Sequence, residues 1–134
     1  TKWGLFTGFV NSLLQMLLGF YAPPAPGLLP LVGMILLDYV LAFTLLGLAG
    51  AIAKPFKNRL VGVAVGTAAV CGILFLCSFL SGVLIWGNLS DGLPAWTYSL
   101  TYNGSYMLPE TILTTVAAVL IYKAAPQLFA AQEK

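Results

Sequence analysis

The stretch LVGVAVGTAAVCGILFLCSFLSGVLIW (residues 60–86) contains no charged residue. A helix that crosses the hydrocarbon core of a bilayer needs about 20 apolar residues, and this run is longer. The strands of a membrane barrel would instead read as short alternating segments. The stretch therefore predicts a membrane-spanning helix, and it indicates that the protein is helical and membrane-embedded.

The composition of the whole chain agrees with that class. Of its 134 residues, 60% are hydrophobic and 7% are charged, whereas soluble domains carry about 25% charged residues. The net charge of +2 is too small to indicate a nucleic-acid partner. We expect one all-α integral membrane domain over residues 1–134, surrounded by the lipid bilayer.

Helix-breaking residues divide the chain outward from residues 60–86. The segments APPAPG (22–27) and KPFKNR (54–59) interrupt the apolar runs, and proline is poorly tolerated inside a helix. The sequence predicts a four-helix transmembrane bundle, with spans at about 3–21, 28–53, 60–86 and 98–123.

The basic residues indicate how such a bundle would be oriented. The connections 21–27 and 87–97 contain no Lys or Arg. If four spans alternate, all 6 basic residues fall on the other side: Lys2, Lys54, Lys57, Arg59, Lys123 and Lys134. Because basic residues concentrate in cytoplasmic loops, we expect a multi-pass protein of the cell membrane with both ends of this chain cytoplasmic.

Small residues recur where helices would touch. The segments 4–8 and 62–66 each begin and end with glycine, and small residues also recur along 47–53. Such patterns let helix backbones approach closely in lipid. We expect them to mediate packing within the chain rather than contact with a partner subunit.

Two carboxylates interrupt the apolar stretches. Asp38 and Glu110 both lie within expected spans, where a charge costs about 3 kcal/mol or more unless it faces a cavity, a counter-charge or a ligand. Asp38 lies about 15 Å below the outer start of its span, at 1.5 Å per residue. We expect a functional role for Asp38. Glu110 follows Pro109, so it could contact a ligand, or it could instead cap a helix broken at the proline or bond to neighbouring backbone.

Aromatic and polar residues gather at the same outer half of the expected bundle. A carboxylate attracts a cation, aromatic rings stack on a planar ligand, and amide or hydroxyl groups fix its orientation. The pattern therefore indicates a binding pocket open to the outside. Two alternatives stay open from the residues alone. Trp86 and Trp96 would also suit an interfacial aromatic belt, and tyrosines at 98, 102 and 106 would also suit helix packing.

The sequence shows no feature of an enzyme. It contains no histidine, and it has no nucleophile–base pair, phosphate-binding glycine loop or nucleotide motif. Cys71 and Cys77 would point in different directions on one helix, so we expect neither a disulfide nor a metal site between them. No cofactor is predicted. Transport driven by ATP would require other subunits.

Three segments carry a family resemblance. FLSGVLIWG (79–87), WTYSLTYNGSYMLPE (96–110) and LLDYVLAFTLLGLAG (36–50) resemble the thiamine-specific S components of energy-coupling-factor (ECF) transporters, the ThiT family. The resemblance extends from Gly4 to about Lys123 and corresponds to the last four helices of a six-helix fold. On this basis we expect that two N-terminal helices and their loop are missing from the chain.

The resemblance implies a substrate-binding membrane subunit that captures thiamine on the extracellular side for ATP-driven uptake. The implied partners are thiamine, a membrane coupling subunit and two ATPase subunits. Ser78 and Leu74 stand where the family commonly has a histidine and a basic residue. The ligand-binding residues that the resemblance implies are Asp38, Tyr39, Gly82, Trp86, Tyr98 and Asn103, with Ser78, Tyr102 and Glu110 as further candidates.

Other functions remain compatible with these residues. The same pocket could serve an S component for another vitamin or for a thiamine-like pyrimidine. An ion-coupled secondary carrier could use Asp38 and Glu110 to bind protons or sodium. A structural subunit without a ligand is the remaining alternative.

Overall fold

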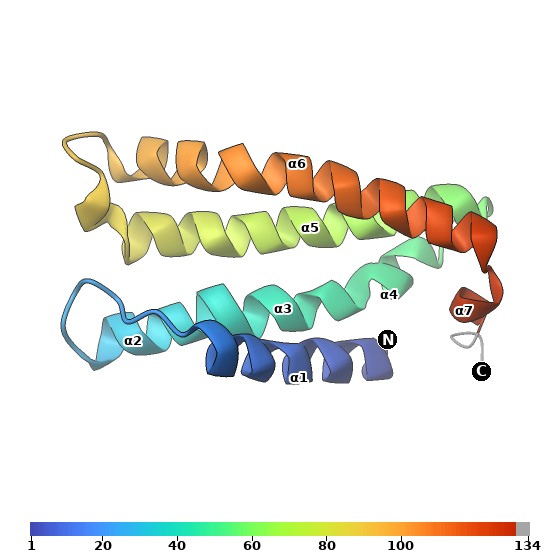
Figure 1. The fold of residues 1–134 in the computed structure, drawn as a ribbon, viewed down its shortest axis with the longest axis horizontal. Coiled ribbons are helices and arrows are strands. Elements are labelled where there is room, and N and C mark those ends of the chain that lie inside the picture. Colours follow the sequence, from blue (N-terminus) through green and yellow to red (C-terminus); the bar gives the residue numbers. More distant parts are fainter. Residues whose placement is uncertain (131–134) are drawn as a thin grey trace.

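The computed structural model describes residues 1–130, and it is helical throughout that range apart from the connections. Figure 1 shows α1, the segment 28–53, α5 and α6 following one another side by side. We call residues 28–53 the broken rod, because several short helical segments compose it. The elements are α1 (Lys2–Gly19), α2 (Leu28–Met34), η1 (Ile35–Val40), α3 (Leu41–Leu45), η2 (Leu46–Leu48), α4 (Ala49–Ala53), α5 (Arg59–Leu84), η3 (Gly87–Leu89), α6 (Ala95–Ala124) and α7 (Gln127–Ala130).

Three helical segments of the described chain are long and apolar enough to cross a membrane. They are the broken rod, α5 and α6, with 26, 26 and 30 residues. The 18-residue α1 is not among them, since it includes Lys2, Asn11 and Gln15. The prediction of an all-helical membrane bundle is therefore confirmed. In the described residues, three helical segments rather than four are long and apolar enough to span a membrane.

Some helix boundaries differ from the expected ones, and α1 ends at Gly19 rather than at 21. α5 ends at Leu84, so Trp86 lies in the connection that follows it, and α6 already begins at Ala95. Pro109 lies inside α6, which continues to Ala124. The alternative in which Glu110 caps a broken helix is therefore wrong. Membrane helices can tolerate proline, because neighbouring groups compensate for the lost backbone hydrogen bond.

Glycines bring α1 into backbone contact with the broken rod. A Cβ atom on Gly4 would lie 2.6 Å from the carbonyl oxygen of Gly47, and one on Gly8 would lie 2.5 Å from that of Phe43. No side chain fits at such distances, so only glycine permits this approach. The second half of the rod, around residues 43–47, is thus packed closely on one side.

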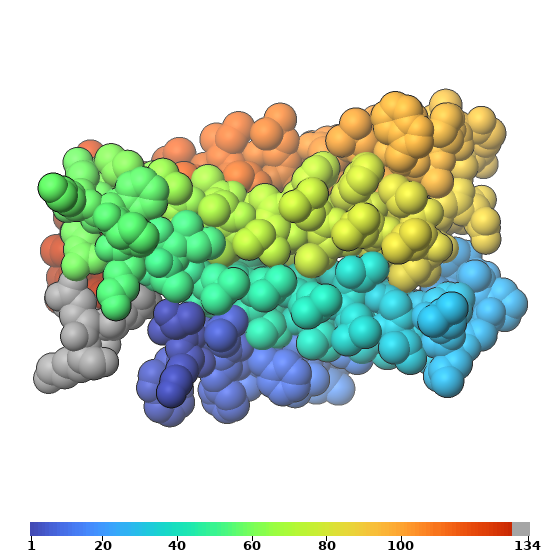
Figure 2. Space-filling view, turned by 180° about the vertical axis from the view of Figure 1, so that it is seen from behind, coloured from blue at the N-terminus to red at the C-terminus, as the bar shows by residue number. Residues whose placement is uncertain are grey.

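The other side of the rod packs against α5 in the same way. A Cβ atom on Gly62 would lie 2.7 Å from the carbonyl oxygen of Ala53, and one on Gly66 would lie 2.5 Å from that of Ala49. Figure 2 shows α5 and the rod forming one continuous face, with α1 beside the rod. The expectation that small residues pack helices within the chain is confirmed.

The two ends of the bundle differ in charge. The N-terminus, α4 and α7 lie at one end, and the connections 20–27 and 85–94 lie at the other (Figure 1). Lys54 and Arg59 line a groove at the first end. Lys134, also expected on this side, lies outside the described residues. The apolar outer faces of α1 and α6 are exposed, with Leu17 at 82% and Leu113 at 70%, which suits contact with lipid.

Candidate functional site

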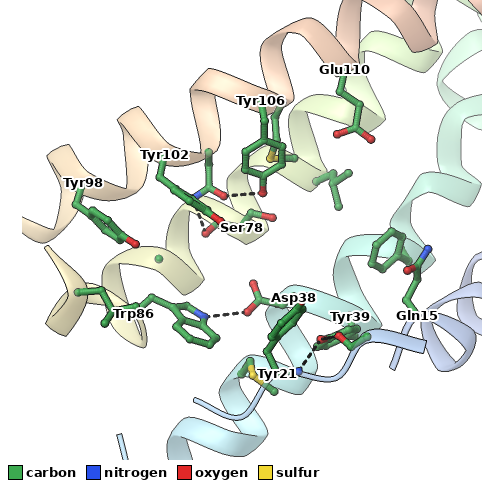
Figure 3. A pocket seen from close by; sticks show the side chains of 18 residues that line it. Gln15, Tyr21, Asp38, Tyr39, Ser78, Trp86, Tyr98, Tyr102, Tyr106 and Glu110 are labelled. Carbon is green, nitrogen blue, oxygen red and sulfur yellow. Dashed lines mark hydrogen bonds between the residues drawn. The ribbon is translucent and has the colours of Figure 1, made fainter. Parts of the chain in front are cut away.

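A cavity of about 510 Å³ lies among α1, the broken rod, α5 and α6. Its size falls within the range of about 300–1,000 Å³ that is typical of small-molecule sites. Figure 3 shows side chains from all these elements around it. All the site residues predicted from the sequence line it: Asp38, Tyr39, Ser78, Gly82, Trp86, Tyr98, Tyr102, Asn103 and Glu110.

Asp38 is held by two donors from the end of α5 and the connection after it. Its Oδ2 atom accepts hydrogen bonds from Ser81 Oγ at 2.7 Å and from Trp86 Nε1 at 3.2 Å. Its Oδ1 atom accepts none from the described residues. The carboxylate is therefore fixed in place and still has one oxygen available to a ligand in the cavity.

Asp38 lies in η1, a six-residue π-helical segment between α2 and α3. A π turn widens an α-helix by accommodating an extra residue, and such turns are frequent at functional sites. The sequence pattern did not indicate this interruption, because the run is uniformly apolar around Asp38.

Tyr39, the next residue of η1, uses its hydroxyl group within the protein. The hydroxyl donates to the carbonyl oxygen of Gly19 at 2.8 Å and accepts from the backbone N–H of Tyr21 at 3.4 Å. The ring stacks on Phe20, with centroids 6.3 Å apart. Tyr39 is buried, so it ties the end of α1 to the broken rod while its ring lines the cavity.

Trp86 is positioned by its backbone as well as by Asp38. The backbone N–H groups of Trp86 and Ile85 both donate to the carbonyl oxygen of Ser81, at 3.3 and 2.8 Å. The ring packs beside a small core of Met34, Tyr39 and Ile85. The indole is thus held against the cavity with its N–H turned to the carboxylate (Figure 3).

Asn103 joins α6 to α5 at the wall of the cavity. Its Nδ2 donates to the carbonyl oxygens of Ser99 at 3.0 Å and Ser78 at 3.3 Å, and its Oδ1 accepts from Tyr106 at 3.0 Å. It is 4% exposed. Most of its polar capacity is therefore satisfied inside the protein.

Gly82 permits the close packing of α5 on α6. A Cβ atom on this residue would overlap the hydroxyl oxygen of Ser99 and lie 2.8 Å from its Cβ atom. Ser99 is fully buried and donates to the carbonyl oxygen of Phe79 at 2.7 Å. Gly82 lines the cavity. A side chain at this position would clash with Ser99 of α6.

Three tyrosines of α6 form one aromatic wall of the cavity. Tyr98 and Tyr102 are stacked with centroids 5.9 Å apart, and Tyr102 meets Tyr106 edge to face at 5.7 Å. Trp96, on the same helix, is 57% exposed and does not line the cavity. The tyrosine face is therefore part of the cavity, whereas Trp96 suits the membrane interface.

Glu110 faces the same cavity from one turn beyond Tyr106 (Figure 3). Its carboxylate makes no hydrogen bond or ion pair with any described residue. Gln15 of α1 lies across the cavity, and Leu74 of α5 also lines it. The cavity thus contains two carboxylates: Asp38, which has donors, and Glu110, which has none.

Several residues of the site were missed by sequence reasoning. Gln15 and Tyr21 line the cavity, and the one available signal was a polar side chain inside α1. Ser81 and Ser99 act by hydrogen-bonding other groups, and a serine in an apolar helix does not reveal its partner. Within residues 1–130, no cluster of potential metal ligands occurs, and both cysteines are buried and free.

A helical membrane bundle around a cavity of carboxylates and aromatic rings has the architecture of a membrane transport protein. The sequence model of the family described as thiamine transporter protein (Thia_YuaJ) matches residues 1–130. The chain belongs to this thiamine transporter family. It is therefore a multi-pass membrane transport protein and not an enzyme.

Individual relatives agree with that assignment. The chain is 33% identical over 137 residues to the thiamine transporter ThiT of Bacillus subtilis (strain 168), covering 95% of this chain and 68% of the relative. It is 34% identical over 143 residues to ThiT of Lacticaseibacillus paracasei, covering 96% and 67%.

A solved structure of ThiT from Listeria monocytogenes has the same fold. The two superpose with a TM-score of 0.73 at 21% identity, over 93% of this chain and 70% of the other. The comparisons do not favour a different vitamin or an ion-coupled carrier.

Proposed function

We propose that the chain is the substrate-binding subunit of an ECF transporter and that its cavity captures thiamine from the extracellular side. The observation that carries this proposal is the pairing of Asp38 with Trp86. A carboxylate with one free oxygen, fixed beside an indole ring, suits a ligand that is both positively charged and aromatic. Thiamine combines a cationic thiazolium ring with a pyrimidine ring, and both relatives are named for its transport.

In the proposed complex, the thiazolium charge lies near Asp38 Oδ1 and a ring of the ligand stacks on Trp86. The tyrosine wall of α6 supplies further ring contacts and hydroxyl groups. Asn103, whose amide is bonded to α5 and to Tyr106, holds that wall in position. No bond of thiamine is made or broken. Release inside the cell follows when a membrane coupling subunit and two ATPase subunits reorient this chain.

The proposal includes four spans with both ends of the chain cytoplasmic. α1 then crosses the membrane as the first span, supported by its glycine contacts with the broken rod. This orientation places the basic end of the bundle inside, as the positive-inside rule requires, and the cavity half outside. Ser90→Cys and Lys57→Cys, which lie in opposite connections, test it. A membrane-impermeant maleimide should label only Cys at position 90 in intact cells, and labelling of position 57 alone would reverse the orientation.

Binding itself is tested with the purified protein in detergent or nanodiscs. Isothermal titration calorimetry and tryptophan fluorescence should both respond to micromolar thiamine, whereas biotin should give no response. A protein that is folded by thermal melting but silent to thiamine in both measurements would overturn the proposal.

Dependence on partners is tested by uptake. Cells that contain this protein with the coupling subunit and both ATPases should accumulate labelled thiamine, and removal of the ATPases should stop accumulation. Uptake that continues without ATPases and collapses with an ionophore would indicate an ion-coupled carrier instead.

A further inference from the structure

Ser81 directs its hydroxyl group away from its own helix. A serine inside a helix commonly donates to the backbone carbonyl oxygen three or four residues earlier, and Ser12 of α1 does so, to Phe9 at 2.6 Å. Ser81 instead donates to Oδ2 of Asp38 in the broken rod, at 2.7 Å and 43 residues away in the chain. The hydroxyl group of Ser81 is therefore used for a carboxylate of the cavity rather than for α5.

The side chain of Ser81 cannot touch a ligand in the cavity. Ser81 is fully buried, and it is not among the described residues that line the cavity. Its backbone carbonyl oxygen accepts from the N–H groups of Ile85 and Trp86, which fixes Ser81 at the last turn of α5. An effect of this side chain on binding must therefore pass through Asp38, to which its hydroxyl group is bonded.

The Trp86 indole also donates to this carboxylate, but it belongs to the cavity lining. In the proposed complex a ring of the ligand stacks on Trp86, so this donor is itself a ligand contact. The terminal torsion of an aspartate side chain is broad, and a single donor leaves part of that freedom. The Ser81 hydroxyl group supplies a second donor, one that the ligand does not contact.

We propose that Ser81 is a positioning residue for thiamine recognition. Its hydroxyl group holds the Asp38 carboxylate in the orientation in which Oδ1 is left for the ligand, both before and after binding. This inference rests on the proposed binding of thiamine. A binding group recognises its ligand well when hydrogen bonds from surrounding residues lock its rotamer beforehand. The bond from Ser81 therefore contributes to affinity although its atoms stay outside the cavity.

The test compares Ser81→Ala with Ser12→Ala. Both replace a fully buried serine and remove one hydrogen bond, but Ser12 bonds within α1 and does not line the cavity. Equilibrium binding of labelled thiamine to the purified proteins should be about tenfold weaker for Ser81→Ala and unchanged for Ser12→Ala. Thermal melting of the same preparations measures the loss of stability separately.

A second comparison separates positioning of the charge from a structural role. In an Asp38→Asn background, Ser81→Ala should weaken binding by less than about threefold, because the angle of a neutral amide matters less to a cation. A structural role predicts the same loss in both backgrounds. If Ser81→Ala does not fold, Ser81→Cys takes its place. A thiol has a similar size and donates only weakly, so this variant should weaken binding by about threefold.

The outcomes distinguish the two proposals. A folded wild-type protein that binds no thiamine overturns the proposed function. Wild-type affinity in Ser81→Ala, or in Ser81→Cys where it is used, overturns this inference alone. An equal loss of affinity in Ser12→Ala, or an equal loss in the Asp38→Asn background, would mean that Ser81 only stabilises the fold.

Discussion

Trp86 and Asp38, 48 residues apart in the chain, are joined by a hydrogen bond of 3.2 Å from the indole Nε1 to Oδ2. The bond sets the plane of an aromatic ring relative to a negative charge. A ligand that satisfies one of these groups therefore meets the other at a fixed position. Recognition of charge and recognition of ring shape are thus coupled in one structural unit, with Ser81 as its third member.

Asp38→Asn should weaken thiamine binding by about 100-fold or more. Asparagine has nearly the same size and still offers an oxygen to Ser81 and Trp86, so the loss reports the missing charge. Removing one partner of a desolvated charge pair costs about 2–5 kcal/mol. Calorimetry gives the change, and Asp91→Asn controls for total charge. Equal affinity of Asp38→Asn and wild type would exclude a cation at this carboxylate.

Trp86→Phe should weaken binding by about tenfold, because phenylalanine retains a stacking surface but cannot donate to Asp38. It should also remove most of the fluorescence response to thiamine. The chain has 3 tryptophans, and Trp3 and Trp96 do not line the cavity. We expect calorimetry to detect thiamine binding to this variant, while the fluorescence change on adding thiamine is lost. An undiminished fluorescence response would place the ligand elsewhere.

Gly82→Ala should lower stability by about 1–3 kcal/mol, as is usual for an added group in a packed interface. The reason is the overlap with Ser99 on α6. Gly72→Ala in the same helix is the control, since a Cβ atom there has no atom within 4 Å, and it should be neutral or slightly stabilising. Thermal unfolding in detergent measures both. Identical melting temperatures for the two variants would contradict the packing account of Gly82.

Tyr39→Phe should cost about 1 kcal/mol of stability, because it removes the donor to the Gly19 carbonyl oxygen. Thiamine affinity should change less than about threefold, since the hydroxyl group is used inside the protein and the ring remains. Melting and calorimetry are compared on the same preparation. A loss of affinity as large as that of Asp38→Asn, with unchanged melting, would mean that the hydroxyl contacts the ligand.

The sequence was sufficient to predict the helices and the neighbourhood of the site. Long apolar runs and the residues that break them predicted the helical segments to within a few residues. The estimated depth of Asp38, Trp86 and Asn103 in the membrane predicted that these residues lie near one another. Depth and spacing carry this information because a membrane helix rises by a constant amount per residue. That these residues contact a ligand stays a prediction.

The rest depended on contacts that leave no pattern along the chain. Ser81 and Ser99 are ordinary serines in the sequence, and only folding shows that one holds Asp38 and the other faces Gly82. The π-helical segment at Ile35–Val40 has no composition of its own, because the same residues would suit an α-helix. Pro109 was a misleading signal, since the bundle keeps α6 continuous through it.

The π-helical segment has a consequence for how one stretch of chain performs two tasks. An extra residue in the turn shifts the angular phase of everything before it relative to everything after it. After this segment, Gly47 packs against the backbone of α1, and Ala49 and Ala53 pack against glycines of α5. At the shift, Asp38 turns to the cavity. Deleting one residue from 35–40 would remove this shift, and Asp38 would then no longer keep its angle relative to the small residues that pack against α1 and α5.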